Sequence, residues 1–266
     1  MASKFVEVTG PRGIDQMLEL VTITCQNDIR GAATNLAEIV AEGGMKAAIC
    51  DDISKKKYFV DAVGSNLNAD IFGWLEEGDR WWEDNHLALH SPLPRACRYE
   101  CEPFWVNQHG FHLKWSNSYL AELDTSDLFE CSSHKAAIIV PVHLPFGQIS
   151  ANCLVSLDSE KEELFEEFRL YGSLFVELIR RFVAGYVQAM RTIKRIPSDC
   201  ILTKREIECL HFAAQGKTDS EIALILHRSH ATIRYHIHRA GTKLDCVNRA
   251  QTIFKASQLG YLGNID

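Results

Sequence analysis

Residues 202–221 read LTKREIECLHFAAQGKTDSE, and this stretch decides the fold of the C-terminal part of the chain. Glu206 follows Thr203 at the third position, and Glu221 follows Thr218 in the same way. Such a pair forms a capping box, because the two side chains accept hydrogen bonds from the unpaired amides at the start of a helix. The stretch therefore predicts the starts of two short helices.

Two further helices are indicated by the same kind of signal. Ser229 caps a third helix that is expected to reach about Leu244, and a fourth helix is expected over about residues 249–259. Gly216 ends the first helix, so the next two helices meet across a tight turn as a helix-turn-helix. Apolar side chains at helical spacing are expected to form the core, namely Ile207, Leu210, Ala213, Ala214, Ile222, Ala223, Leu226, Ile253, Phe254 and Ala256.

The third helix presents an exposed face that suits DNA. Ile233 and Ile237 point inward, so Arg234 and His238, four residues apart, share the opposite face. Such a face fits the major groove, where an arginine can bind guanine through two hydrogen bonds. Contacts with bases and phosphates are expected from Lys217, Arg228, His230, Thr232, Arg234, Tyr235, His238, Arg239, Lys243 and Arg249. The alternative is a small helical bundle that binds no DNA.

The charge of the chain is unevenly divided. The whole sequence has 28 Lys and Arg against 35 Asp and Glu, a net charge of −7. Residues 191–266 hold 12 basic and 7 acidic residues, a net charge of +5, which leaves −12 for residues 1–190. Only the C-terminal part therefore has the charge expected of a DNA-binding domain.

The N-terminal part mixes helical and strand-like patterns. A leading helix is expected over about residues 14–42, and a long amphipathic helix over about residues 161–190. An aromatic-rich helical region is expected over 71–99, and a polar helix over 115–123. Strand-like runs at 46–50 and 58–63 indicate one hairpin, and the runs at 136–143 and 149–157 indicate a second.

Four segments of the C-terminal part resemble the signature of LuxR-type helix-turn-helix domains. They are LTKRE at 202–206, GKTDSEIA at 216–223, SxxTIRxH at 229–236 and KLxxxNRA at 243–250. The resemblance covers residues 202–262. It implies that Glu206, Leu210 and Gly216 are scaffold positions, and that Thr232, Arg234 and His238 lie on or near the side that faces DNA.

Three positions depart from this signature. His227-Arg228 stands at a turn where glycine and an apolar residue are usual, and His238 stands where arginine or lysine is common. Gly241 lies inside the third helix. Histidine adopts the left-handed conformation more readily than most residues, so His227 is compatible with the turn. These departures concern the DNA sequence recognised and not DNA binding itself.

LuxR-type modules occur on phospho-acceptor receivers and on ligand-binding domains. Asp51-Asp52 after a strand is similar to the acidic pair of a receiver, but a receiver would alternate strands and helices in a parallel sheet. Here a helix precedes two hairpin-like pairs of strands. We therefore expect an α-β-α sandwich with an antiparallel sheet, similar to the autoinducer-binding domain of quorum-sensing LuxR proteins.

The aromatic-rich region resembles the ligand site of that domain. Trp82-x8-Ser91-Pro92, followed by Trp105, is similar to the family's Tyr-x8-Asp-Pro and later Trp. A neutral serine lacks the charge-assisted hydrogen bond of the aspartate, so a ligand other than an ordinary acyl-homoserine lactone is possible. The candidate ligand contacts are Trp74, Trp82, Ser91, Tyr99, Phe104, Trp105, Ser150 and Asn152. For each of them, the alternative is an ordinary structural position.

Other chemistry finds little support in the sequence. Cys97-x3-Cys101, with His109, His112, Cys131 and His134, could hold zinc only if folding joined them, and buried free cysteines are the expected state. No phosphate loop, nucleophile elbow or metalloprotease motif is present. No catalytic residue, metal or cofactor is expected, so the protein is not expected to be an enzyme. The longest apolar run is too short for a membrane span, and the lack of a secretory signal favours the cytoplasm.

The fold class expected from these patterns is α+β. Residues 1–190 form a sensor and dimerisation domain, 191–201 a linker, and 202–266 an all-α four-helix DNA-binding domain. Helix-turn-helix proteins usually read two half-sites, so we expect a homodimer on double-stranded DNA, with a small molecule as effector. The alternative is a ligand-independent regulator whose N-terminal domain serves dimerisation or protein partners.

Overall fold

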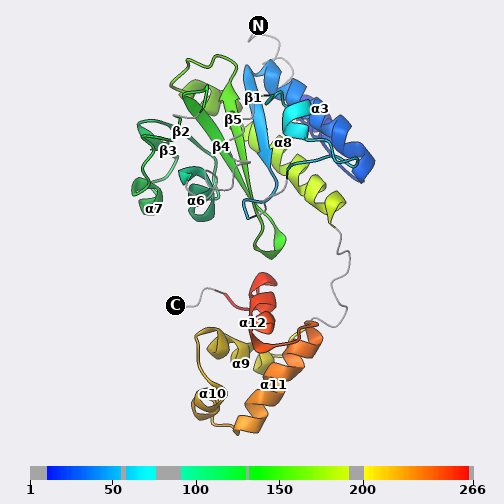
Figure 1. Cartoon of the computed structure of the whole chain (residues 1–266), viewed down its shortest axis with the longest axis vertical. Helices are drawn as coiled ribbons and strands as arrows, with labels where there is room; N and C mark the ends of the chain where they lie inside the picture. Colours follow the sequence, from blue (N-terminus) through cyan, green and yellow to red (C-terminus); the bar gives the residue numbers. More distant parts are fainter. Residues whose placement is uncertain (1–10, 55–57, 76–90, 130–131, 192–200, 264–266) are drawn as a thin grey trace. The chain divides into compact units, whose positions relative to one another are not determined.

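The computed structural model describes residues 11–54, 58–75, 91–129, 132–191 and 201–263 (Figure 1). These residues divide into two compact units, and the division falls after Arg191. Each unit has its own hydrophobic core. Most of the predicted linker, residues 191–201, lies outside the described residues, so its role stays a prediction.

The N-terminal unit is built around one antiparallel sheet of five strands (Figure 1). The strands lie in the order β1-β5-β4-β2-β3, and their bounds are β1 Met45–Cys50, β2 Phe104–Asn107, β3 Gly110–His112, β4 Ala136–His143 and β5 Ile149–Ser156. The helices of this unit are α2 Pro11–Leu20, η1 Gln26–Asp28, α3 Ile29–Glu42, α4 Leu67–Asp70, α6 Pro92–Tyr99, α7 Ser118–Ala121 and α8 Phe165–Met190. A short turn, η3 Pro145–Gly147, joins β4 and β5.

Helices cover both faces of this sheet. The helices α3 and α8 pack together, α3 against β1 and α8 against β4 and β2, whereas α6 packs against β5 from the other side (Figure 1). Side chains alternate along a strand, so the side chains of Ile138 and Leu154 lie on one face of the sheet. The side chains of Ile139 and Cys153 lie on the other face. The predicted α+β class and the α-β-α sandwich with an antiparallel sheet are confirmed.

The predicted hairpin between residues 46–50 and 58–63 is wrong. β1 pairs with β5, and Ala48 lies opposite Cys153 in that register. Residues 58–63 form only a single bridge, between Val60 and Asn66. The reason is Asp61, whose carboxylate accepts hydrogen bonds from the backbone N–H groups of Val63 and Ser65 and so bends the chain into a loop.

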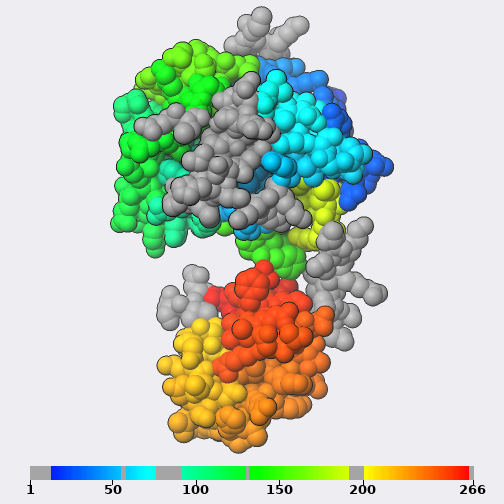
Figure 2. All heavy atoms as spheres, viewed as in Figure 1, coloured from blue at the N-terminus to red at the C-terminus, as the bar shows by residue number. Residues whose placement is uncertain are grey.

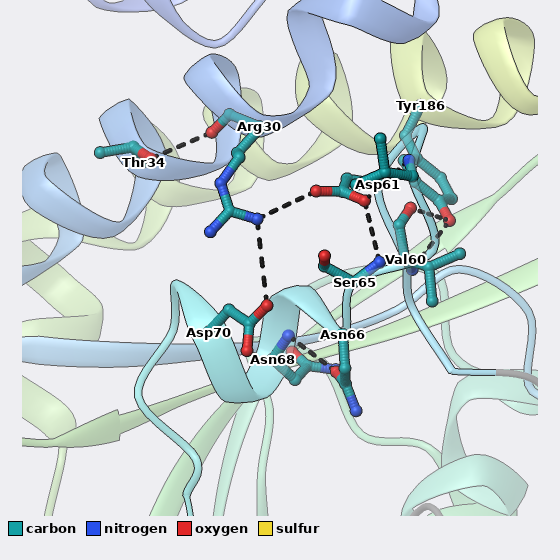
Figure 3. A network of polar contacts seen from close by, with 10 residues as sticks. Arg30, Thr34, Val60, Asp61, Ser65, Asn66, Asn68, Asp70 and Tyr186 are labelled. Carbon is teal, nitrogen blue, oxygen red and sulfur yellow. Dashed lines mark hydrogen bonds and ion pairs between the residues drawn. The ribbon is translucent and has the colours of Figure 1, made fainter.

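A network of polar contacts fixes this loop to its surroundings (Figure 3). Arg30 of α3 lies 2.9 Å from the Asp61 carboxylate and 3.9 Å from that of Asp70. The hydroxyl of Tyr186, on α8, donates to the carbonyl of Val60 at 3.0 Å. Burial alone would raise the pKa of the Asp61 carboxyl, but hydrogen bonds from the Ser65 amide and the Arg30 guanidinium lower it below its usual range.

The same loop covers the open edge of β1. The side chain of Asn68 accepts from the N–H of Ile49 at 3.0 Å and donates to its carbonyl at 2.8 Å. The indole N–H of Trp74 donates to the carbonyl of Ala47 at 2.6 Å. These side chains pair the backbone groups that an edge strand otherwise leaves exposed. The loop therefore joins β1, α3 and α8.

Several predicted helices have different bounds. The single leading helix is wrong, because α2 ends at Leu20 and a separate helix starts at Ile29. Asp28 causes the break, since its carboxylate accepts from the amides of Thr24 and Cys25. Of the aromatic region at 71–99, residues 92–99 are helical as α6, residues 71–75 are not, and residues 76–90 lie outside the described part. The polar helix is confined to α7, and the long helix begins at Phe165.

The C-terminal unit consists of the four predicted helices, α9 Lys204–Ala214, α10 Asp219–Ile225, α11 His230–Lys243 and α12 Arg249–Gln258 (Figure 1). Their core includes Leu210, Ile222, Ile233 and Ala256, all fully buried. The expected core position of Phe254 is wrong, because its side chain is 63% exposed. It lies two residues before Ala256, which is about 200° around a helix, on the opposite side.

Candidate nucleic-acid interface and ligand cavity

Local hydrogen bonds define the start of each helix in the C-terminal unit. The Thr203 hydroxyl accepts from the N–H of Glu206, and the Glu206 carboxylate accepts from the N–H of Thr203 at 2.7 Å. Thr218 and Glu221 repeat this arrangement, and the Ser229 hydroxyl accepts from the N–H of Thr232. The three predicted caps are confirmed. Asn248 adds a fourth cap, at the start of α12.

A tight turn joins α10 to α11. His227 has a φ of 51°, the left-handed conformation that the sequence led us to expect. The next residue, Arg228, donates its N–H to the carbonyl of Ala223 at 2.9 Å, which closes the end of α10. The helix-turn-helix geometry is therefore preserved although histidine replaces glycine.

The helix α11 buries one face and exposes the other. Ile233, Ile237 and Ala240 are buried against the core, whereas Arg234 and His238 are exposed on the same outer face. The atoms of α11 are orange in Figure 2, between the yellow of α9 and α10 and the red of α12. With its arginine, this outer face has the chemistry to read bases in a major groove.

Other predicted DNA contacts lie along α11, in the turn before it and just before α10. Tyr235 and Arg239 are exposed, and the guanidinium carbon of Arg239 lies 5.9 Å from the centre of the Tyr235 ring. Arg228 and His230 are exposed at the turn before α11 and at the start of α11. Lys217 is exposed just before α10, and Thr232 is half-buried in the first turn of α11. All of these DNA contacts remain predictions.

Two of the predicted phosphate contacts have partners within the domain. The Lys243 ammonium lies 2.7 Å from the Glu206 carboxylate and donates to the carbonyl of Ile201. Arg249 forms an ion pair with Asp219 and donates to the carbonyl of Lys217. These contacts tie α11 to α9 and α12 to α10. A phosphate would have to compete with them.

The carboxyl group of Glu206 is buried and remains charged. Burial by itself would raise its pKa, but hydrogen bonds from the Lys243 ammonium and from Thr203 outweigh that effect and hold the pKa below its usual range. The ion pair therefore stabilises the fold at neutral pH.

Close packing accounts for Gly241 inside α11. A Cβ atom on Gly241 would lie 3.0 Å from the hydroxyl oxygen of Thr252, on α12. The missing side chain lets these two helices approach. The departure from the family signature at this position is thus structural.

A cavity of about 100 Å³ lies in the N-terminal unit, between the sheet and α6. Its sheet wall consists mostly of small side chains that alternate along the strands onto the α6 face, namely Ala48, Cys50, Ala137, Ile139, Ala151, Cys153 and Val155. Leu93 and Pro94 of α6 form the opposite wall. Trp74, Leu128, Phe129 and Ser132 are among the other lining residues. Small residues opposite a helix leave space for a ligand.

Two of the eight predicted ligand residues line this cavity, Trp74 and Asn152. Ser150 is also buried, but its hydroxyl pairs with the Asn152 side chain. The side-chain amide of Asn152 donates to the carbonyl of Val140. Both side chains point to the face of the sheet opposite the one that Ala151 and Cys153 occupy. Asn152 therefore lines the cavity through its backbone and not through its side chain.

The other described ligand candidates are not among the lining residues. Ser91 caps α6, and its hydroxyl accepts from the N–H of Leu93. Tyr99 is 54% exposed and stacks on Tyr119. Phe104 is buried in the core, and Trp105 stacks on His112. Trp82 lies outside the described residues. The set of ligand contacts stays a prediction, of which the cavity unites only a part.

Cys97 and Cys101, which lie four positions apart in the sequence, have different surroundings. Cys97 is buried in α6, whereas Cys101 is exposed beyond its end. Among the described residues, no group of three or more His, Cys, Asp or Glu side chains is arranged to hold a metal ion. None of the helices in the described part is both long and apolar enough to cross a bilayer.

Comparison with known proteins shows similarity to one family model, to two transcriptional activators and to one solved structure. The family model described as "Bacterial regulatory proteins, luxR family" matches residues 200–256. The transcriptional activator protein LuxR of Aliivibrio fischeri is 36% identical over 197 residues, which cover 71% of this chain and 73% of that protein. The transcriptional activator protein VanR of Vibrio anguillarum is 29% identical over 153 residues, 56% of this chain and 62% of that protein. A solved structure of SdiA in complex with octanoyl-rac-glycerol is 16% identical and matches 94% of this chain and 95% of that chain, with a TM-score of 0.46.

Proposed function

Because this chain belongs to the LuxR family of DNA-binding transcription regulators, we propose that a small molecule bound in its N-terminal cavity controls its binding to DNA. The observation that carries this proposal is the cavity between the sheet and α6. Its lining residues come from β1, α6, β4 and β5, which are far apart in the sequence. A bound molecule would therefore stabilise the packing of the whole N-terminal domain.

A physical connection supports the coupling between the cavity and DNA binding. Trp74 lines the cavity and belongs to the same loop as Val60. The Tyr186 hydroxyl holds Val60, and Tyr186 lies on α8, which ends at Met190, just before the predicted linker. A ligand that favours one position of Trp74 would thereby favour one position of the end of α8. In this mechanism the ligand shifts the population between weak and strong DNA binders.

We propose that the DNA-binding form is a homodimer. One recognition helix contacts a single half-site, and helix-turn-helix dimers read two half-sites about one helical turn apart. The two relatives named above are transcriptional activators, which favours activation as the regulatory effect here. Such a regulator would work in the cytoplasm, where bacterial DNA lies.

Native mass spectrometry of the protein purified from its own host tests this function. We expect a dimer that carries a bound small molecule. The variant Ala151→Leu fills the cavity and should lose the bound mass while it keeps the dimer, because Ala151 is at the sheet wall. The variant Ala121→Leu, at an exposed site on α7, is the matched control and should retain the ligand.

Two results would count against the sensor mechanism. An empty dimer that binds DNA equally well with and without host extract would indicate the ligand-independent alternative. A bound mass that persists in Ala151→Leu would indicate a ligand site other than this cavity.

A further inference from the structure

The cavity wall is uncharged in the part that the structure describes. No Asp, Glu, Lys or Arg side chain is among its described lining residues. Burial raises the pKa of the Cys50 thiol to about 11 and that of the Cys153 thiol to about 12. Both thiols are therefore neutral at physiological pH. An ionised ligand would lose its hydration against this part of the wall without gaining an opposite charge from it.

Most polar groups at the wall are engaged within the protein. The indole N–H of Trp74 donates to the carbonyl of Ala47, and the side-chain amide of Asn152 points to the opposite face of the sheet, where it donates to Val140 and Ser150. Neither group can bind a ligand without breaking a buried hydrogen bond, which costs free energy. They therefore contribute surface and not recognition.

Ser132 differs from these groups. Its hydroxyl oxygen accepts a hydrogen bond from the backbone N–H of His134 at 3.1 Å. A hydroxyl also has one proton to donate, and for this proton no acceptor is found among the described residues. Since Ser132 lines the cavity, that proton is available to an acceptor atom on a bound molecule.

The size of the cavity limits the ligand further. Its volume is about 100 Å³. A dry, apolar protein cavity of about 150 Å³ holds one benzene molecule. The present cavity is of the same order, so a single carbon ring is the upper size of a ligand that it holds without movement of its walls.

Building on the sensor function proposed above, we propose that the cavity selects a small, uncharged, mostly apolar molecule with one hydrogen-bond acceptor, which the Ser132 hydroxyl recognises. A ketone, an ester or an ether on a short carbon skeleton has this chemistry. An acyl amide fits less well, because its N–H would also need an acceptor. The Ser91 hydroxyl does not supply one, since it caps α6 and is not part of the lining.

Thiol labelling of the whole chain tests this proposal. Cys50 and Cys153 line the cavity, whereas Cys25 and Cys101 are exposed and serve as internal controls. The protein reacts with N-ethylmaleimide alone or in the presence of millimolar cyclohexanone, cyclohexanecarboxylate or cyclohexylammonium. Mass spectrometry measures the rate at which each cysteine is modified. We expect cyclohexanone to slow the labelling of the two cavity thiols several-fold, and the two ions to leave all four rates unchanged.

The variant Ser132→Ala tests the hydrogen bond. Its dissociation constant for cyclohexanone should rise about five- to tenfold, as for the loss of one neutral hydrogen bond. Methylenecyclohexane has nearly the same shape but no oxygen acceptor, so it should protect the variant and the unaltered protein equally. This second compound also shows that the cavity of the variant is intact.

The possible failures are distinguishable. Two results would overturn the ligand class and leave the sensor function standing. One is that cyclohexanecarboxylate protects the cavity thiols as well as cyclohexanone does. The other is that Ser132→Ala weakens the binding of cyclohexanone and of methylenecyclohexane equally. A bound mass from the host that remains in Ala151→Leu would overturn the sensor site itself, and the ligand class with it. A native ligand that proves to be charged would also overturn the ligand class.

Discussion

The ammonium nitrogen of Lys243 lies 2.7 Å from the carboxylate oxygen Oε2 of Glu206, and this contact joins the end of the recognition helix to the start of α9. The Glu206 side chain is 4% exposed and that of Lys243 is 19% exposed. The same carboxylate oxygen accepts from the N–H of Thr203. One buried carboxylate thus caps α9 and fixes α11, so the position of the DNA-facing helix depends on it.

Removal of the positive charge of Lys243 should lower the stability of the C-terminal domain. Lys243→Met leaves the Glu206 carboxylate buried without its partner, and we expect a loss of about 3 kcal/mol in the free energy of unfolding. Urea denaturation followed by circular dichroism measures this loss. Lys217→Met, at an exposed lysine, is the matched control and should change stability by less than about 0.5 kcal/mol. Equal effects in the two variants would contradict a special role for the pair.

The same pair predicts a dependence of stability on pH. The pKa of Glu206 is lowered in the folded state, so its contribution is fully present above the unfolded value of about 4.3. The contribution is lost as the pH falls from there through the folded pKa. Between about pH 5 and pH 3, the free energy of unfolding of the C-terminal domain should therefore fall more steeply in the unaltered protein than in the Glu206→Gln variant. Parallel curves for the two proteins would show that Glu206 does not titrate in this way.

Arg234 should make a base contact through its exposed side chain. Arg234→Ala is expected to weaken binding to DNA selected from a random library by about 1–3 kcal/mol without loss of stability. Fluorescence anisotropy measures the affinity, and thermal denaturation checks the fold. Arg205→Ala, on the exposed surface of α9, removes the same charge away from the recognition helix. If both variants bind DNA equally well, Arg234 does not read the bases.

Gly241 and Thr252 should be coupled. Alanine normally stabilises a helix by about 1 kcal/mol relative to glycine, but the added methyl group in Gly241→Ala would press against the Thr252 hydroxyl. We expect Gly241→Ala to destabilise the protein, and the same change to become stabilising in the Thr252→Ala background. A double-mutant cycle of unfolding free energies measures the coupling, for which we expect about 1–2 kcal/mol. Additive effects would mean that the two helices tolerate the methyl group.

Ser91 should act as a helix cap and not as a ligand contact. Ser91→Ala is expected to lower the stability of the N-terminal domain by about 1 kcal/mol, whereas Ser91→Asp should keep it, because aspartate is an equally good cap. Denaturation with and without cyclohexanone separates the two roles. The stabilisation that cyclohexanone provides should be the same in both variants, and a change in it would assign Ser91 to the binding site.

The C-terminal domain could be predicted from the sequence because its signals are local. The caps at Thr203, Thr218 and Ser229 each use a hydrogen bond between residues three positions apart. The left-handed turn at His227 depends on one residue. The sequence did not indicate the contacts between distant residues of this domain. One of them is the ion pair with Asp219, which engages Arg249, a predicted phosphate contact.

The N-terminal domain was harder to predict because its decisive contacts join distant residues. Residues 58–63 have the apolar composition of a strand, yet Arg30 and Tyr186 hold them as a loop. The cavity also has a sequence signal, since Ala151, Cys153 and Val155 alternate with larger or polar side chains along one strand. Most of the predicted ligand contacts are aromatic residues, yet Phe104 and Trp105 belong to the packed sheet.

The pairing of β1 with β5 sets an order of events during synthesis. Cys50 lies opposite Ala151, so about a hundred residues must leave the ribosome before β1 gains its neighbour. Until then the newly made chain carries an unpaired strand, a state that invites aggregation. The cavity also does not exist until that moment, because β1 and β5 both form its wall. The proposed small-molecule ligand would thus stabilise the newly made chain only after most of the N-terminal domain has been translated.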